Sequence, residues 1–476
     1  MRTRMTTRVA WLAIVALIAG ACGTSASPSV SPGGSAASQP PVSAAPGPKA
    51  LLRWYCCLGT GEDPTQVPTE EKVAADWSAS QDLGDLKIEI VTYDAARATL
   101  STQIASGNSP DIVGPVGLGG LASFEGQWLD LTPYIAKTGF DLGQFPDEAV
   151  QTFNVGAQGQ VGIPFAIYPS MVWYKRDMFD EAGLEYPPHE YGATYKWPDG
   201  REVEWNYDTV KELALKLTVD ESGKDATEAG FDPESIVQYG FEPQRDDLRG
   251  LGAYWGPGSL AAADGTTVEI PAAWQDAWKY FYDGMWKDHF IMTGPVAESE
   301  DFSGGGYTFF SGRVAMSLNF LWTTYGVADA GTDWDLAAIP SHNGKVTSPL
   351  NTDTFGIHKD TKSPDAAFDA LTYLHEEASD TLLQLYGAMP ARPERQDAFF
   401  ETLAQTEGFP DEVDWQVVKD SAQYADKPNF EAPVPKYNET INTLVKYRTK
   451  WVATPGLNMD TEIEALRAEL QAIWDS

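Results

Sequence analysis

Aromatic and carboxylate side chains that follow strand-like segments are the residues of this sequence best suited to binding chemistry. In an open α/β sheet a ligand lies beyond the carboxyl ends of the strands, so residues at such positions are candidates for one site. Core packing, helix capping and simple turns are the alternative roles for these positions. Six candidates come from strand ends and glycine-flanked loops: Trp54, Tyr55, Asp94, Gly117, Trp255 and Tyr307.

The sequence carries no recognisable catalytic or metal-binding signature. Its five histidines are scattered and its three cysteines lack zinc spacing. No Ser-His-Asp pattern or phosphate-binding glycine loop stands out. Several of the sixteen tryptophans instead fall in loop-like contexts. We therefore expect a binding protein without catalytic residues, metal or cofactor.

The adjacent residues Cys56 and Cys57 follow the first strand-like segment. If Cys22 is modified, they form the only available pair. They can close a tight vicinal disulfide in an oxidising compartment, and such a ring could contact a ligand. A purely structural ring or two thiols are the alternatives.

The pattern of apolar residues predicts strands alternating with helices at the start of the globular part. Strand-like segments at 51–55, 86–90 and 111–113 are separated by helices that begin at Thr69 and Asp94 as N-caps. This order indicates βαβ units and an α/β fold with a mostly parallel sheet. Further helices are expected at 207–217, 274–286, 363–374 and 460–474, and strands at 314–318 and 334–339.

Five segments, in order along the chain, resemble conserved motifs of the extracellular solute-binding proteins that serve ABC sugar importers, the maltose-binding-protein-like family. They are 108–113 (NSPDIV), 128–135 (WLDLTPYI), 162–165 (GIPF) with 172–184 (VWYKRDMFDEAGL), 310–316 (FSGRVAM) and 389–393 (MPARP). The chain departs from the family pattern at Lys175, where Asn is usual, and in its long insert at 189–206.

This resemblance implies a two-lobe fold of the periplasmic-binding-protein type, in which the lobes close on a ligand by a hinge. The first crossover is expected near 163–166 and the second near 353–356. The N-terminal lobe would comprise 51–163 plus about 354–385, and the C-terminal lobe 164–353 plus about 386–476. No catalytic function is implied.

The resemblance also adds four candidate site residues. Tyr168 follows the first crossover and Trp322 takes a position where relatives carry a sugar-stacking tryptophan. Asp353 lies near the second crossover, and Arg392 lies in the Met-Pro turn. Sugars present apolar ring faces and hydroxyl rims, so aromatic plates beside carboxylates or Arg suit them. Surface solvation is the alternative for Asp353 and Arg392.

The first 49 residues are typical of an exported, tethered protein. Arg2, Arg4 and Arg8 precede or begin an apolar run too short to span a bilayer, which predicts a signal peptide at 1–21. Cys22 follows small residues as in a bacterial lipobox, although Ala19 stands where Leu is usual. Residues 22–49 are rich in Gly, Ala, Ser and Pro and predict a disordered linker. We expect a lipid anchor on Cys22 and a location on the extracellular face of the cell membrane.

The formal charge of −35 excludes an electrostatic preference for nucleic acid. It is compatible with a neutral ligand, and we expect a monomer that binds a carbohydrate and a permease. The alternatives are a surface glycoside hydrolase, which would use two carboxylates, and a binding protein for a polyamine, a peptide or a metal complex.

Overall fold

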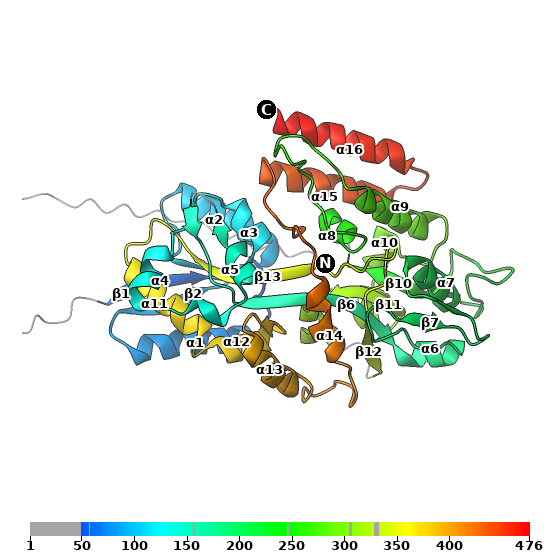
Figure 1. The fold of residues 1–476 in the computed structure, drawn as a ribbon, viewed down its shortest axis with the longest axis horizontal. Coiled ribbons are helices and arrows are strands. Elements are labelled where there is room, and N and C mark those ends of the chain that lie inside the picture. The colour runs from blue at the N-terminus through cyan, green and yellow to red at the C-terminus, as the bar shows by residue number, and fades with distance from the viewer. Residues whose placement is uncertain (1–48, 57, 156–157, 245–246, 304–306, 328–332) are drawn as a thin grey trace, which may run out of the picture. The chain divides into compact units, whose positions relative to one another are not determined.

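The computed structural model describes residues 49–476 except 57, 156–157, 245–246, 304–306 and 328–332 (Figure 1). The predicted signal peptide, Cys22, Cys57 and all of the predicted linker but its last residue lie outside the described residues. Within the described part, no helix is both long and apolar enough to cross a membrane.

A sheet of ten strands organises the fold (Figure 1). Its main path runs β2-β1-β3-β13-β6-β11-β10-β9, and β12 and β14 also pair with β6. The strands are β1 (Ala50–Tyr55), β2 (Gly84–Glu89), β3 (Ile112–Gly117), β6 (Ala166–Lys175), β9 (Val219–Asp220), β10 (Ile236–Pro243), β11 (Val314–Phe320), β12 (Trp334–Ala337), β13 (Leu350–Ile357) and β14 (Met389–Pro390). Two small hairpins add β4 (Asn154–Val155) with β5 (Gly159–Gln160), and β7 (Thr194–Lys196) with β8 (Glu202–Glu204).

The strands β6 and β13 connect the two ends of this sheet. The first residues of β6 pair with β13 and its later residues pair with β11 and β12, all antiparallel. β13 in turn pairs with β3 through its later residues. Parallel pairing occurs outside this junction, between β1 and its neighbours β2 and β3 and between β10 and β11. The sheet is therefore mixed, because the connecting strands run against their neighbours.

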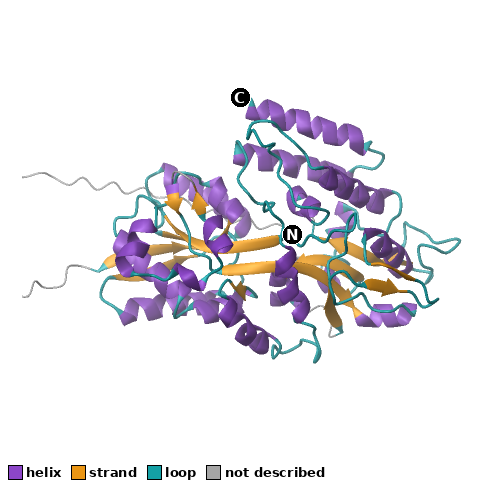
Figure 2. Cartoon of the chain, viewed as in Figure 1, coloured by secondary structure: helices purple, strands orange, loops and turns teal. Residues whose placement is uncertain are grey.

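Helices pack along the sheet (Figure 2). For example, α1 packs on β2, α7 on β10 and α14 on β6, while α8 contacts α9 and α15 contacts α16. The longer helices are α1 (Val67–Ser80), α2 (Tyr93–Ala105), α7 (Tyr207–Leu217), α9 (Ala272–Trp286), α11 (Pro364–His375), α12 (Ser379–Tyr386), α13 (Gln396–Leu403), α15 (Tyr437–Ala453) and α16 (Met459–Trp474). The shorter ones are α3 (Leu118–Ser123), α4 (Thr132–Thr138), α5 (Asp147–Thr152), α6 (Arg176–Ala182), α8 (Leu248–Ala253), α10 (Gly294–Ala297), α14 (Gln416–Ser421) and the 3₁₀ helix η5 (Leu321–Tyr325).

The apolar pattern explains most of these elements. Nearly every residue of β6 and β11 is buried, as expected for strands covered on both faces. Helix α7 begins and ends where the pattern predicts, and the Asn206 side chain caps it by accepting from the Thr209 amide. The predicted caps of the first two helices are wrong. Thr69 lies inside α1, and Asp94 lies in the first turn of α2.

Candidate functional site

The two connecting strands each bring a polar side chain to the same place. Tyr168 lies on β6 and Asp353 on the paired strand β13. Burial, and next the nearby Asp353 carboxyl group, raise the pKa of the Tyr168 hydroxyl. Asp353 is 7% exposed. Its burial, and next the nearby carboxylate of Glu431, raise the pKa of Asp353 to about 7.

The segment that precedes α15 is hydrogen-bonded to the start of β13. The Asp426 carboxylate accepts hydrogen bonds from the Leu350 amide at 3.1 Å and the Phe430 amide at 2.6 Å. The Asn429 side chain donates to the Leu350 carbonyl at 2.7 Å. These bonds fix the backbone next to Glu431 against the central sheet.

Glu431 directs its carboxylate at the turn between β3 and α3. One oxygen, Oε2, lies 3.3 Å from the position that a Cβ on Gly117 would take, and Oε1 lies 3.0 Å from that of Gly119. The absence of a side chain at both glycines therefore permits this close approach. Burial raises the pKa of Glu431 to about 7, while the positive charge of Arg249 opposes that rise.

Arg249 on α8 is a buried cation, only 2% exposed. Its Nε and Nη2 donate to Asp247 Oδ2 at 3.2 and 3.0 Å, and Nη2 also donates to the Tyr437 hydroxyl at 3.2 Å. Its Nη1 is buried without a hydrogen-bond partner among the described residues. The guanidinium therefore keeps a donor available for an additional acceptor.

Trp322 supplies an aromatic surface directly after β11. Its ring stacks on Phe320 with centroids 4.4 Å apart and planes inclined by 24°, and it meets Tyr168 edge-on at 5.3 Å. The side chain is half-buried, and its indole nitrogen has no partner in the described structure. One donor is thus unused, and part of the side chain is exposed.

We refer to Tyr168, Arg249, Trp322, Asp353 and Glu431 as the central polar cluster. It combines an indole, two carboxyl groups and a guanidinium, the groups that exchange hydrogen bonds with hydroxyls and cover apolar ring faces. The described residues include no group of three or more His, Cys, Asp or Glu side chains placed to hold a metal ion.

Four of the residues expected from the sequence meet at this cluster: Gly117, Tyr168, Trp322 and Asp353. Whether they bind a ligand stays a prediction. Three others are buried in the core beside β1 and β14, and their role in ligand binding also stays a prediction: Trp54, Tyr55 and Arg392. The Trp54 indole donates to the Gly114 carbonyl at 2.6 Å and the Tyr55 hydroxyl to the Ala96 carbonyl at 2.7 Å. Arg392 is buried and donates to the His375 carbonyl and to Glu376.

Trp255 is not in an exposed loop, and that expectation is wrong. The residue is 4% exposed and its ring stacks on Tyr207 with centroids 3.3 Å apart. The flanking glycines serve close packing instead. A Cβ on Gly252 would lie 2.4 Å from Trp274, and one on Gly258 would lie 2.5 Å from Pro271. Glycine here permits burial of the indole among helices rather than its presentation to a ligand.

The remaining candidates lie apart from the cluster contacts. Asp94 is exposed on α2, and Tyr307 is half-buried with its ring 5.3 Å from that of Phe310. Cys56 is buried, with its sulfur 3.2 Å from the Thr60 carbonyl oxygen. Because Cys57 is outside the described residues, the vicinal disulfide stays a prediction.

Sequence reasoning missed Arg249, Glu431 and Tyr437. A signal exists for Arg249, since a lone cation within the apolar stretch 248–255 indicates a buried, paired charge. Glu431 is one of 68 acidic residues and lies beyond the segments that carry the family resemblance. Its proximity to Gly117 arises from a contact across more than three hundred residues.

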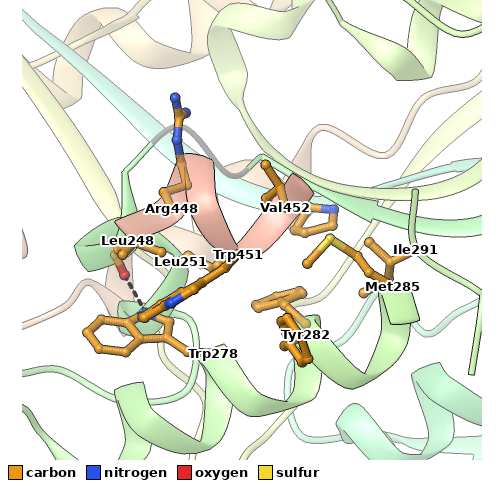
Figure 3. Close-up of a pocket in the computed structure, with 11 residues that line it drawn as sticks. Leu248, Leu251, Trp278, Tyr282, Met285, Ile291, Arg448, Trp451 and Val452 are labelled. Carbon is orange, nitrogen blue, oxygen red and sulfur yellow. Dashed lines mark hydrogen bonds between the residues drawn. The ribbon is translucent and has the colours of Figure 1, made fainter. Parts of the chain in front are cut away.

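A separate apolar cavity of about 30 Å³ lies among α8, α9 and α15 (Figure 3). Trp278, Tyr282, Met285 and Trp451 are among the side chains that line it, and the Trp278 indole donates to the Leu248 carbonyl at 2.8 Å. This volume accommodates at most a few water molecules. The cavity is too small and too apolar to hold a hydroxyl-rich ligand.

Comparison with known proteins identifies the fold. An ABC substrate-binding protein from Listeria monocytogenes in complex with cycloalternan is 18% identical, with a TM-score of 0.69 over 89% of this chain and 99% of that one. The GacH receptor of Streptomyces glaucescens, solved unliganded and with acarbose, is 16% identical, with a TM-score of 0.64 over 90% and 99% of the chains. The maltodextrin-binding domain MalE from Bdellovibrio bacteriovorus, bound to maltotriose, is also 16% identical, with a TM-score of 0.64 over 89% and 100%.

These similarities confirm the predicted two-lobe α/β fold of the periplasmic-binding-protein type. No curated protein sequence matches the chain. The model of the family described as bacterial extracellular solute-binding protein matches residues 63–380, about two thirds of the sequence. The chain therefore belongs to the bacterial extracellular solute-binding proteins.

Proposed function

We propose that this protein captures a carbohydrate, in particular an oligosaccharide, at the central polar cluster and delivers it chemically unchanged to an ABC permease. The observation that carries this proposal is the half-buried indole of Trp322 in one cluster with the buried carboxyl group of Asp353 and the half-buried one of Glu431. An indole face covers the C–H surface of a sugar ring, and the carboxyl groups accept from its hydroxyls. The saccharide complexes of the structural relatives support the same ligand class.

Ligand entry requires the contact between Gly117 and the cluster to open, because the carboxyl groups of Asp353 and Glu431 lie close against that glycine. The strands β6 and β13 are two of the covalent connections between the proposed lobes, and Tyr168 and Asp353 lie on them. We propose that residues 51–163 plus about 354–385 move as one lobe and that 164–353 plus about 386–476 move as the other. Closure around a sugar would then satisfy the unused donors of Trp322 and Arg249.

A thermal-shift screen tests the ligand class. A saccharide that binds only the folded protein raises the melting temperature, so we expect at least one oligosaccharide from α- and β-linked series to do so in a saturable manner. Asp353→Asn should reduce that shift. A panel without any active saccharide would refute carbohydrate capture, and release of reducing sugar by the purified protein would show an enzyme instead.

We further propose that Cys22 is lipidated after removal of residues 1–21, which tethers a monomeric receptor to the extracellular face of the membrane. The lipobox-like sequence and the uncharged linker support this proposal. Metabolic labelling with a fatty acid should mark the wild-type protein and not Cys22→Ser. Equal labelling, or release of both proteins into the medium, would contradict the anchor.

A further inference from the structure

The carboxyl groups of Asp353 and Glu431 converge on a single point beside Gly117. A Cβ on Gly117 would lie 3.3 Å from Asp353 Oδ1 and 3.3 Å from Glu431 Oε2. The two carboxyl oxygens are therefore no more than about 6.6 Å apart, so one donor group placed between them, in contact with Gly117, can approach both. Glu431 Oε2 is buried and has no hydrogen-bond partner in the described chain.

The charges around this point are predominantly negative. Besides burial, the groups that shift the pKa of Asp353 are the Glu431 carboxylate and the Tyr168 hydroxyl, neither of which is a cation. The charges that shift the pKa of Glu431 are those of two arginines, Arg249 and Arg97, and of two further carboxylates, Asp247 and Asp426. Arg249 already donates to Asp247, so its charge is largely shared. The position beside Gly117 would accordingly stabilise a positive charge supplied from outside.

The same cluster also offers hydrogen-bond donors. Nη1 of Arg249 and the indole nitrogen of Trp322 are buried without partners in the described part of the protein. Arg249 is more than nine-tenths buried, so this unused donor costs free energy until an acceptor arrives. A complementary ligand therefore carries acceptor oxygens as well as a cationic donor.

We propose that the site selects an amine-bearing saccharide, whose ammonium group lies between Asp353 and Glu431 beside Gly117 while its hydroxyl oxygens accept from Arg249 and Trp322. This inference rests on the proposed function and narrows its ligand class. An ammonium group supplies three donors and a charge that offsets the mutual repulsion of two carboxylates, whereas a hydroxyl supplies one donor and no charge. The ring of Tyr168, whose hydroxyl lies near Asp353, also favours a cation.

Matched oligosaccharides that differ at one substituent test this proposal. Chitosan, chitin and cellulose oligomers share a β-1,4-linked glucose skeleton with an amine, an acetamide or a hydroxyl at carbon 2. Glucosamine and galactosamine with their neutral parents, and maltose-series sugars, complete the panel, and spermidine serves as an amine without a sugar. Titration calorimetry at pH 7 should give an amine-bearing saccharide about 10- to 100-fold tighter binding than its neutral parent and tighter binding than spermidine.

The possible outcomes separate this inference from the proposed function. A neutral saccharide that binds as tightly as its amine counterpart would overturn the amine preference and leave carbohydrate capture standing. Binding of spermidine without any saccharide, or no binding at all, would overturn both. Preferential binding of an amine-bearing saccharide would support both.

Two variants test whether Asp353 causes the preference for an amine over a neutral saccharide. Asp353→Asn removes one of the converging charges and should reduce the ratio of amine to neutral affinity by about tenfold. Asp85→Asn changes the net charge equally at an exposed position of β2 and should leave that ratio unchanged. Circular dichroism verifies that each variant is folded. An unchanged ratio in folded Asp353→Asn would overturn the placement of the ammonium group.

Discussion

Replacement of Trp322 by alanine tests the proposed site most directly. The indole stacks on Phe320 at 4.4 Å and contacts Tyr168 edge-on at 5.3 Å, yet it is only half-buried. Trp322→Ala should therefore remove the aromatic surface available to a sugar. The loss of a stacked ring is worth about 1–3 kcal/mol, which corresponds to a dissociation constant about 5- to 150-fold higher.

Trp255→Ala is the matched control, because it removes a side chain of the same type from the core rather than from the proposed site. Trp255 is 4% exposed and stacks on Tyr207 at 3.3 Å. Its truncation should cost about 3–5 kcal/mol of unfolding free energy. The protein that remains folded should bind its ligand with wild-type affinity, since no member of the central polar cluster changes.

Titration calorimetry with the saccharide found in the thermal-shift screen would measure affinity, and urea unfolding of the ligand-free variants would measure stability. The expected pattern is a large affinity loss with a modest stability loss for Trp322→Ala, and the reverse for Trp255→Ala. Wild-type affinity in Trp322→Ala, or a strong affinity loss in folded Trp255→Ala, would refute the assignment of the site to the cluster.

Three further predictions concern backbone packing, protonation and the support of the site. Gly240→Ala should lower the urea midpoint, because the alanine Cβ would lie 2.0 Å from the Ala214 carbonyl oxygen of α7. Such overpacking costs about 1–3 kcal/mol of unfolding free energy. An unchanged midpoint would contradict the tight contact between α7 and β10. The raised pKa of Asp353, about 7, means that the folded protein holds a proton that the unfolded chain loses near pH 4, so this group makes stability fall as pH rises from about 4 to 7. Asp353→Asn should flatten that decline in melting temperature, and parallel profiles would show that Asp353 titrates normally. Asp426→Ala should weaken saccharide binding several-fold as well as lower stability, because its carboxylate holds the segment that carries Glu431; full affinity in calorimetry would show that this support is dispensable.

Local sequence patterns were sufficient to predict some of the elements, but not the connecting strands β6 and β13. Residues 207–217 form α7 as predicted, since their apolar residues recur at helical spacing and Asn206 provides a cap. The predicted strand 51–55 is within β1. Element starts were less predictable, because Thr69 and Asp94 could each cap a helix, yet Pro68 and Tyr93 already lie within α1 and α2.

The residues of the candidate site differ in how far the sequence could predict them. Tyr168 and Trp322 could be proposed because they follow segments that carry the family resemblance, and Asp353 because it lies near the expected second crossover. Trp255 was misjudged, because flanking glycines predict a loop when only nearby residues are considered. In the fold those glycines accommodate Trp274 and Pro271. Exposure of a tryptophan is thus set by neighbours that the local sequence does not reveal.

The sequence by itself determined the alternation of strands and helices at the start of the globular part, the membership of a two-lobe family and the acidic character of the chain, because each depends on periodicity, motif order or composition. Only the tertiary structure decided that Glu431 and Arg249 join Asp353, and that two carboxyl groups meet beside Gly117. The physical reason is distance along the chain. Contacts between residues 117, 249, 353 and 431 form only after β3, α8, β13 and the segment before α15 have packed together, and burial then sets the charge and the hydrogen bonding of each group.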